Sequence, residues 1–433
     1  MKRFFLKVLG LFFLLLPLYL QGGPVTVTGR VNRAEALVRL LVVDDLLTMH
    51  ETEVARTTSD AQGFFLLEGP VDQVTPACLA VELERVDWVV TPGASYEVTV
   101  TLPEVDPSKS YFERPLPTLR IKTASDNGLC RQLIVSDQIT NSYVLDYFDA
   151  IYRRRQYRYL DSIKAAIQAN LGDGVPYVRQ YNEYRIASVQ MAVNADGGKK
   201  VINEYFDGKP VLYRCQSYMD LFKDLFKNNT LDDGFLQRNP RLAELIKLYR
   251  LRNYYNEEPR ARKAVREQLQ RLRAKTQFAE TRQGVDHVLA EFDRFAMGAS
   301  APDFALKDAA GATVRLSDFK DRMVVLQFVE GGSATVEHQF ETLSDLHRQW
   351  QDSVQLVTVC TKDQMAACRK RFEEHRYDWP LLNLGNDLLL LERYEVRTFP
   401  EYFIILPGTK IGMAPAPSPD QTLDKHVTHL YGK

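Results

Sequence analysis

The first part of the chain shows the alternation of apolar and polar residues that is typical of β-strands. Residues 25–30 alternate valine or glycine with threonine or arginine, and further short strand-like runs follow at 38–43, 64–67, 78–83 and 96–102. A period of two indicates strands with one buried face. Turn residues separate the runs, and this spacing is typical of two packed sheets. Residues 24–105 are therefore predicted to form a small antiparallel β-sandwich.

The pattern changes to a helical one between residues 129 and 297. Apolar residues recur there at steps of three and four, which is the period of an amphipathic helix. Breaks such as Asp196-Gly197-Gly198 and Pro240 divide the stretch into separate helices. The sequence therefore predicts a middle α-helical domain over residues 129–297.

The chain begins with basic residues and a short apolar segment. Lys2 and Arg3 are followed by the 13-residue apolar run 8–20. A membrane-spanning helix needs about 20 apolar residues, so residues 1–20 are predicted to be a signal peptide, with an uncleaved anchor as the alternative. No later segment is apolar enough to span. We expect the protein in the periplasm or cell envelope.

The charge balance argues against a polyanionic partner. The chain has 55 basic and 56 acidic residues, and loss of the first 20 residues changes its formal charge from −1 to −4. Nucleic-acid-binding proteins carry a strongly basic surface. Basic and aromatic residues do interleave at 152–159, but in an acidic exported chain this favours a solvated helix face. Such a face is compatible with an acidic partner or anionic lipid, so membrane association without a spanning segment is left open.

Two stretches resemble known families. Gly29-Arg30-Val31 with the later 59–65, SDAQGFF, resembles carboxypeptidase-regulatory or transthyretin-like modules at the front of exported bacterial proteins. Residues 301–320, APDFALKDAAGATVRLSDFK, and the apolar run 323–328 resemble the opening of TlpA/ResA-type thioredoxin-like proteins of the AhpC/TSA–redoxin superfamily.

This second resemblance implies an α/β thioredoxin-like fold over residues 298–433. It assigns helices to 337–350 and 365–376, a strand to 354–360, a final hairpin to 402–411 and a closing helix to 423–430. The whole chain is thus predicted to be a multidomain α+β protein with a sandwich, a helical region and a thioredoxin-like domain.

The resemblance also locates the redox cysteines of active relatives, which form a C-x-x-C at the start of a helix. One thiolate attacks a disulfide and the second thiol resolves the intermediate. Alignment on Phe328 places Ser333 and Val336 at these positions, and neither can form a disulfide. A peroxiredoxin alignment places His338 at the peroxidatic position. No cysteine lies between residues 215 and 360, so the catalytic positions are predicted to be vacant.

Ser333 with His338 as its base is a substitute nucleophile that the spacing disfavours. Side chains five residues apart on a helix point away from each other, and the sequence designates no third residue to orient the histidine. A role for Ser333 or Thr335 as the helix N-cap needs only one side-chain oxygen, and we favour it.

The five cysteines, Cys78, Cys130, Cys215, Cys360 and Cys368, are an odd number, so not all of them can pair. Cys360 ends a predicted strand and Cys368 lies in the next helix. They are the alternative redox pair, although buried thiols or a structural bridge are favoured. A bridge between Cys130 and Cys215 depends on geometry.

No cofactor or metal is predicted. His426 and His429 share a helix face at a spacing of three, but a third ligand is missing. No phosphate-binding loop, zinc motif or carboxylate dyad is visible.

A binding surface is expected around Pro400, which the resemblance identifies with the cis-proline of the family. Backbone next to this proline pairs with an incoming peptide in active relatives, a contact that needs no thiol. The residues expected to converge there are Glu330, Gly331, Gly332, Ser333, Thr335, Phe399 and Pro400.

Three functional hypotheses follow. The first is a non-catalytic envelope protein that binds an exported or outer-membrane protein. The second is a TlpA/ResA-type thiol-disulfide oxidoreductase that uses Cys360 and Cys368. The third, a peroxiredoxin-like peroxidase, lacks its thiol.

Overall fold

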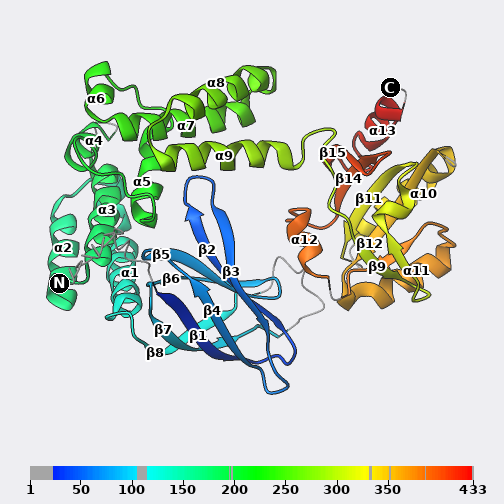
Figure 1. The fold of residues 1–433 in the computed structure, drawn as a ribbon, viewed down its shortest axis with the longest axis horizontal. Coiled ribbons are helices and arrows are strands. Elements are labelled where there is room, and N and C mark those ends of the chain that lie inside the picture. The colour runs from blue at the N-terminus through cyan, green and yellow to red at the C-terminus, as the bar shows by residue number, and fades with distance from the viewer. Residues whose placement is uncertain are drawn as a thin grey trace, which may run out of the picture.

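The computed structural model describes residues 23–104, 115–194, 196, 198–330, 334–350, 353–385 and 387–431. These residues form a β-sandwich, a helical region beside and above it, and an α/β domain, shown on the right in Figure 1. The predicted signal peptide, residues 1–20, lies outside the described residues. Within them, none of the helices combines the length and apolar character that crossing a bilayer requires.

Two four-stranded sheets, ordered β4-β1-β7-β8 and β3-β2-β5-β6, make up the N-terminal domain. The strands are β1 (Pro24–Val31), β2 (Leu37–Asp45), β3 (His50–Thr58), β4 (Phe64–Pro70), β5 (Thr75–Val81), β6 (Glu84–Val90), β7 (Ser95–Thr101) and β8 (Thr118–Ala124). Their inner faces share one apolar core that includes Val27, Leu40, Leu79 and Val98. Assignment to the transthyretin or carboxypeptidase-regulatory type stays a prediction.

The sandwich differs from the prediction in strand direction and in extent. β1 pairs with β7 in parallel, so the domain is not purely antiparallel. Between β1 and β7 the chain also forms strands of the second sheet, and a crossover connection of this kind allows β1 and β7 to be parallel. β8 pairs with β7 beyond the predicted end at residue 105. Leu119 and Ile121 alternate with polar residues and pack against the sandwich core, but the other side chains of β8 are exposed, so its apolar pattern is short.

The helices fall within the range 129–297, where the sequence has a helical period. They are α1 (Leu129–Asp146), the π-helix η2 (Asp149–Arg153), α2 (Arg158–Leu171), α3 (Pro176–Val193), α4 (Lys199–Tyr205), α5 (Gln216–Phe226), α6 (Asp233–Arg238), α7 (Pro240–Glu257), the 3₁₀ turn η3 (Pro259–Ala261), α8 (Arg262–Lys275) and α9 (Ala279–Arg294). In Figure 1, α9 runs across the top of the sandwich toward the α/β domain.

The tip of the β2–β3 hairpin inserts into the helical region. Leu46 and Leu47 are buried in the helical core. Lys223 of α5 donates a hydrogen bond to the Leu46 carbonyl at 2.6 Å, and Arg214 donates one to the Val43 carbonyl at 2.8 Å. The sandwich and the helices are therefore packed against each other through a common apolar core.

The C-terminal domain is a seven-stranded sheet, ordered β10-β9-β13-β12-β11-β14-β15, with helices on both faces. Its elements are β9 (Ala305–Asp308), β10 (Thr313–Arg315), η4 (Leu316–Phe319), β11 (Met323–Val329), α10 (Ala334–Trp350), β12 (Val354–Cys360), η6 (Lys362–Gln364), α11 (Met365–His375), β13 (Leu381–Asn383), α12 (Leu389–Arg393), β14 (Glu401–Leu406), β15 (Lys410–Ala416) and α13 (Leu423–Tyr431). Every residue of β11 is buried, as expected for a strand with parallel and antiparallel neighbours between two helical layers. Helices α10, α11 and α13 pack on one face of the sheet, and α12 packs on the other.

Helix α12 also connects the C-terminal domain to the sandwich. The guanidinium of Arg39 on β2 donates to both carboxylate oxygens of Glu392 on α12, at 3.0 and 2.7 Å. The Arg39 side chain is only 5% exposed. A two-point hydrogen-bonded ion pair of this kind fixes orientation as well as contact.

Candidate functional site

The predicted binding surface begins at the carboxyl end of β11. Phe328 and Glu401 of β14 are the last pair of this antiparallel register, so Glu330 and Phe399 each lie two residues beyond it, at the same end of the two strands. The Phe399–Pro400 peptide bond is cis, as the resemblance implied. Glu330 is 8% exposed, so its side chain lies beneath the surface. The structure thus places Glu330 and the Phe399–Pro400 segment at the same end of the β11–β14 pair.

The other members of the expected surface are not all described. Gly331, Gly332 and Ser333 lie outside the described residues, and so does the side chain of Thr335. The possible N-cap role of Ser333 or Thr335 therefore remains a prediction.

Val336 occupies the position that the second redox cysteine takes in active relatives. It lies in the first turn of α10, is 2% exposed, and packs in the same core as Phe340 and Cys360. An isopropyl group in this place fills the core but offers no sulfur to attack or resolve a disulfide.

His338 is solvent-exposed and has an acidic neighbour. Its Nε2 lies 3.5 Å from Oδ1 of Asp420, a residue that the sequence did not single out. Its side chain is 69% exposed, so the ring is accessible on the helix surface.

Cys360 and Cys368 are in direct contact, with their Sγ atoms 2.9 Å apart. Cys360 lies opposite Val329 in the β11–β12 register, and Cys368 is on α11. Donation of a hydrogen bond by Cys360 lowers the pKa of the Cys368 thiol, and burial opposes this effect. The two residues are 0% and 2% exposed, so an external disulfide does not reach either sulfur without opening of the domain.

The remaining cysteines are inert by burial. Desolvation raises the pKa of Cys78 to about 12 and also raises the pKa values of Cys130 and Cys215. Cys130 packs in the sandwich core and Cys215 in the helical core, so the two are in separate cores and do not form the bridge considered above. All five cysteines are among the described residues, and none forms a disulfide there. Buried protonated thiols are poor nucleophiles.

The structure brings together histidines that the sequence did not connect. His50 at the start of β3 and His287 on α9 are 237 positions apart in the chain, yet their rings stack with centroids 3.9 Å apart. In the described part of the chain, they and Asp44 form the group of three side chains able to hold a metal ion. His426 and His429 have no place in such a group. Only the fold could reveal this contact, because no local spacing encodes it.

A central parallel β11–β12 pair, an antiparallel β14–β15 hairpin and a helix starting at the carboxyl end of β11 define a thioredoxin-like domain. Comparison with known families agrees, since residues 297–413 match the AhpC/TSA family. The C-terminal domain of this chain belongs to that thioredoxin-like redoxin family.

Individual relatives cover the same part of the chain. Thiol-disulfide oxidoreductase ResA of Bacillus subtilis (strain 168) is 26% identical over 125 residues, which are 29% of this chain and 69% of that protein. The thioredoxin domain of a thiol-disulfide oxidoreductase from Bacteroides vulgatus is 26% identical, with a TM-score of 0.29 over 31% of this chain and 98% of that one. A thiol:disulfide interchange protein from Bacteroides sp. is 24% identical, with a TM-score of 0.30 over 32% and 93%.

Proposed function

We propose that this chain is an exported envelope protein whose thioredoxin-like domain binds another exported or outer-membrane protein without exchanging disulfides. The observation that carries the proposal is the buried Val336 at the resolving-cysteine position, together with serine at position 333. Thiol-disulfide exchange needs an accessible thiolate. The five thiols of the chain are all buried, so the domain supplies the fold of its relatives without their nucleophile.

The binding surface that we propose is the end of the sheet around Glu330, Phe399 and Pro400. The Phe399–Pro400 backbone directly precedes β14, at the end of the β11–β14 pair, and an incoming extended segment can form main-chain hydrogen bonds with it. Phe399 is half-buried, and it offers an aromatic ring for contact with such a segment. Affinity would then come from backbone pairing and apolar contact rather than from sulfur chemistry.

Reduction of insulin by dithiothreitol, followed by turbidity, tests the non-catalytic part of the proposal. A relative with an intact C-x-x-C serves as the positive control. We expect the wild-type chain to match the background without protein, and Cys360→Ser to match it too. Turnover above background that Cys360→Ser abolishes would overturn the proposal in favour of an oxidoreductase.

The binding part is tested by capture from envelope extract with four immobilised chains, the wild type and three variants. We expect a protein retained by the wild type to be lost with Phe399→Ala and kept with Lys370→Ala, a control at an exposed residue of α11. Glu330→Gln provides a second variant of the proposed site, which removes the charge of a largely buried side chain and keeps its volume. If Phe399→Ala and Glu330→Gln, both folded, retain the same proteins as the wild type, the surface is not the binding site.

A second candidate function is a relocated dithiol at Cys360 and Cys368. The 2.9 Å contact between the sulfur atoms and the lowered pKa of Cys368 favour it. The near-complete burial of both residues favours instead a structural cross-link, because a substrate disulfide must approach the attacking sulfur in line. The insulin assay with Cys360→Ser distinguishes these two roles.

A further inference from the structure

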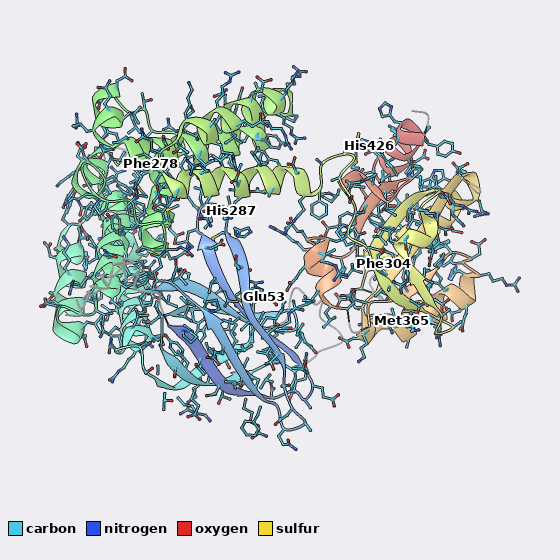
Figure 2. All side chains as sticks on the ribbon, in the orientation of Figure 1. Glu53, Phe278, His287, Phe304, Met365 and His426 are labelled. Carbon is cyan, nitrogen blue, oxygen red and sulfur yellow. The ribbon has the colours of Figure 1, made fainter. Side chains whose placement is uncertain are left out.

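A cluster of two histidines and two aspartates lies where the β2–β3 hairpin meets α9. Figure 2 shows His287 on α9 at the tip of this hairpin. His50 comes from the first residue of β3, and Asp44 and Asp45 end β2. One nitrogen of each histidine and one carboxylate oxygen of Asp44 lie within 4.8 Å of one another.

Each histidine is oriented by a carboxylate. Nδ1 of His287 is 3.0 Å from Oδ2 of Asp45, which leaves Nε2 of that ring for another ligand. Asp45 is itself fixed, because its Oδ1 accepts a hydrogen bond from the backbone N–H of Leu47 at 2.8 Å. A carboxylate that holds the second nitrogen of a histidine is the usual support of a metal-binding imidazole.

Asp44 is held in a similar way. Its Oδ1 is 2.6 Å from Nδ1 of His50, and its Oδ2 accepts a hydrogen bond from the Thr52 hydroxyl at 2.7 Å. The side chains of Asp44 and His287 are 16% and 14% exposed, whereas that of His50 is 43% exposed. Two of the three ligands are therefore preorganised, and the third has freedom to turn.

The local charge favours a cation. Asp44 and Asp45 carry two negative charges, and within the described ranges neither forms an ion pair with lysine or arginine. Lys223 interacts electrostatically with Asp45, but its ammonium donates to the Leu46 carbonyl. Arg252, on the side of the cleft formed by α7, is paired with Glu291.

We propose that Asp44, His50 and His287 bind a divalent metal ion of the zinc class, which pins the tip of the β2–β3 hairpin to α9. Two imidazole nitrogens and one carboxylate oxygen are a donor set that suits Zn²⁺, at bond lengths of about 2.0–2.2 Å. The ion would replace the hydrogen that lies between Nδ1 of His50 and Oδ1 of Asp44, and both of these atoms would bind it. The ring proton of His50 then resides on Nε2.

Binding requires one small rearrangement. A metal ion lies in the plane of each imidazole that binds it, and the two rings are now nearly parallel, at 10°. One ring must therefore rotate about its Cβ–Cγ bond, and the more exposed His50 is the ring that turns. Neighbouring ligand atoms around a tetrahedral ion are about 3.3 Å apart. Nδ1 of His50 and Oδ1 of Asp44, now 2.6 Å apart, must therefore separate, while the more widely spaced atoms of the cluster, all within 4.8 Å, move closer.

The remaining coordination position would face solvent. His50 and His287 line a cleft of about 860 Å³ between the sandwich, α9 and α12, so water or an acidic group of a ligand can reach the ion. Three protein ligands with one open position are the arrangement of an accessible zinc site rather than of a closed structural one.

Calorimetric titration of the chelator-treated full chain with Zn²⁺ tests the site without reference to any activity. We expect one equivalent of tight binding by the wild type. His50→Ala and His287→Ala should each weaken binding at least tenfold, since each removes one of three ligands. The matched control is His426→Ala combined with His429→Ala, which removes the two histidines on α13 and should leave the affinity unchanged.

The variants also separate loss of a ligand from loss of the fold. His50 is exposed enough for its replacement to be tolerated, and circular dichroism with a thermal melt of each metal-free variant verifies folding. Absence of Zn²⁺ binding by the wild type would overturn the proposal. So would unchanged affinity in His50→Ala and His287→Ala, an outcome that would point to thiol ligands instead.

Discussion

The sulfur atoms of Cys360 and Cys368 lie 2.9 Å apart within the same core that buries Val336. The thiol pair of this domain therefore lies on β12 and α11. Redox-active relatives carry their cysteines elsewhere, at the N-terminus of the helix that corresponds to α10. A change of position of this kind keeps sulfur in the domain but removes it from contact with a substrate.

This contact predicts a structural disulfide under oxidising conditions. The sulfur atoms need to approach by less than about 1 Å to reach the bond length of a disulfide. A bridge that closes so short a loop stabilises the folded chain by about 2.5 kcal/mol on the chain-entropy estimate. Mass spectrometry of the oxidised chain should find Cys360 linked to Cys368.

The matched measurement is urea denaturation of the chain with and without reductant. Cys360→Ser should show the lower stability in both conditions, whereas the wild type should lose stability only when reduced. A wild-type chain whose Cys360 and Cys368 stay reduced in air would contradict this prediction.

Placing cysteines at positions 333 and 336 should give the domain thiol-disulfide exchange activity if the missing thiols are the reason for its inactivity. The double variant Ser333→Cys/Val336→Cys places a C-x-x-C at the start of α10, and we expect it to reduce insulin above the wild-type background. Val336→Cys removes little volume from the core, so we expect it to cost no more than about 0.5–1.5 kcal/mol. Ser333→Cys alone is the control, because a single thiol cannot resolve the mixed disulfide. A double variant that forms the disulfide but has no activity would show that more than the thiols has been lost.

The ion pair between Arg39 and Glu392 should contribute to the docking of the C-terminal domain on the sandwich. Glu392→Ala leaves the nearly buried Arg39 guanidinium without its main acceptor, and we expect a loss of about 1–3 kcal/mol, since Glu392 is one-third exposed. The control Glu97→Ala breaks an exposed pair with Lys122 and should cost less than about 1 kcal/mol. The urea midpoint measures both. Equal effects of the two substitutions would contradict a docking role for Arg39.

Alkaline pH should destabilise the fold, in part through Cys78. Burial raises the pKa of this thiol from 9.0 to about 12, so between these values the folded chain keeps a proton that the unfolded chain loses. The unfolded state then binds fewer protons, and stability falls as pH rises by up to about 1.4 kcal/mol per pH unit for this group. Cys78→Ala and Cys78→Ser should both flatten the dependence of the unfolding free energy on pH between 10 and 11. A slope equal to that of the wild type would show that Cys78 is ionised or exposed in the folded chain.

The sequence predicted the elements whose burial is encoded locally. The run 354–360 became β12 with the predicted bounds, because an apolar stretch between β11 and β13 has no other place than the centre of the sheet. β3 was missed for the opposite reason. Its burial alternates largely between exposed and half-buried positions, but polar residues occupy both kinds of position, so the sequence shows no alternation of apolar and polar residues. Its place depends on pairing with β2, which a single strand does not reveal.

The candidate sites differ in the same way, because some depend on local sequence and others on contacts between distant parts of the chain. Val336 was identified because a family motif fixes its distance from Phe328 in the sequence. The contact of His50 with His287 was not, because the hairpin and α9 meet only after the sandwich and helices have packed. Asp420 beside His338 is a similar case, since the loop before α13 folds back onto α10.

The most direct measurement of the central claim is a count of thiols that react with Ellman's reagent in the native chain. We predict that none of the five cysteines reacts within minutes at neutral pH. In denaturant all five should react after reduction, and three should react without reduction when Cys360 and Cys368 are bridged. A native thiol that reacts at once, and that disappears in Cys360→Ser or Cys368→Ser, would place a working nucleophile in this domain and contradict the non-catalytic role.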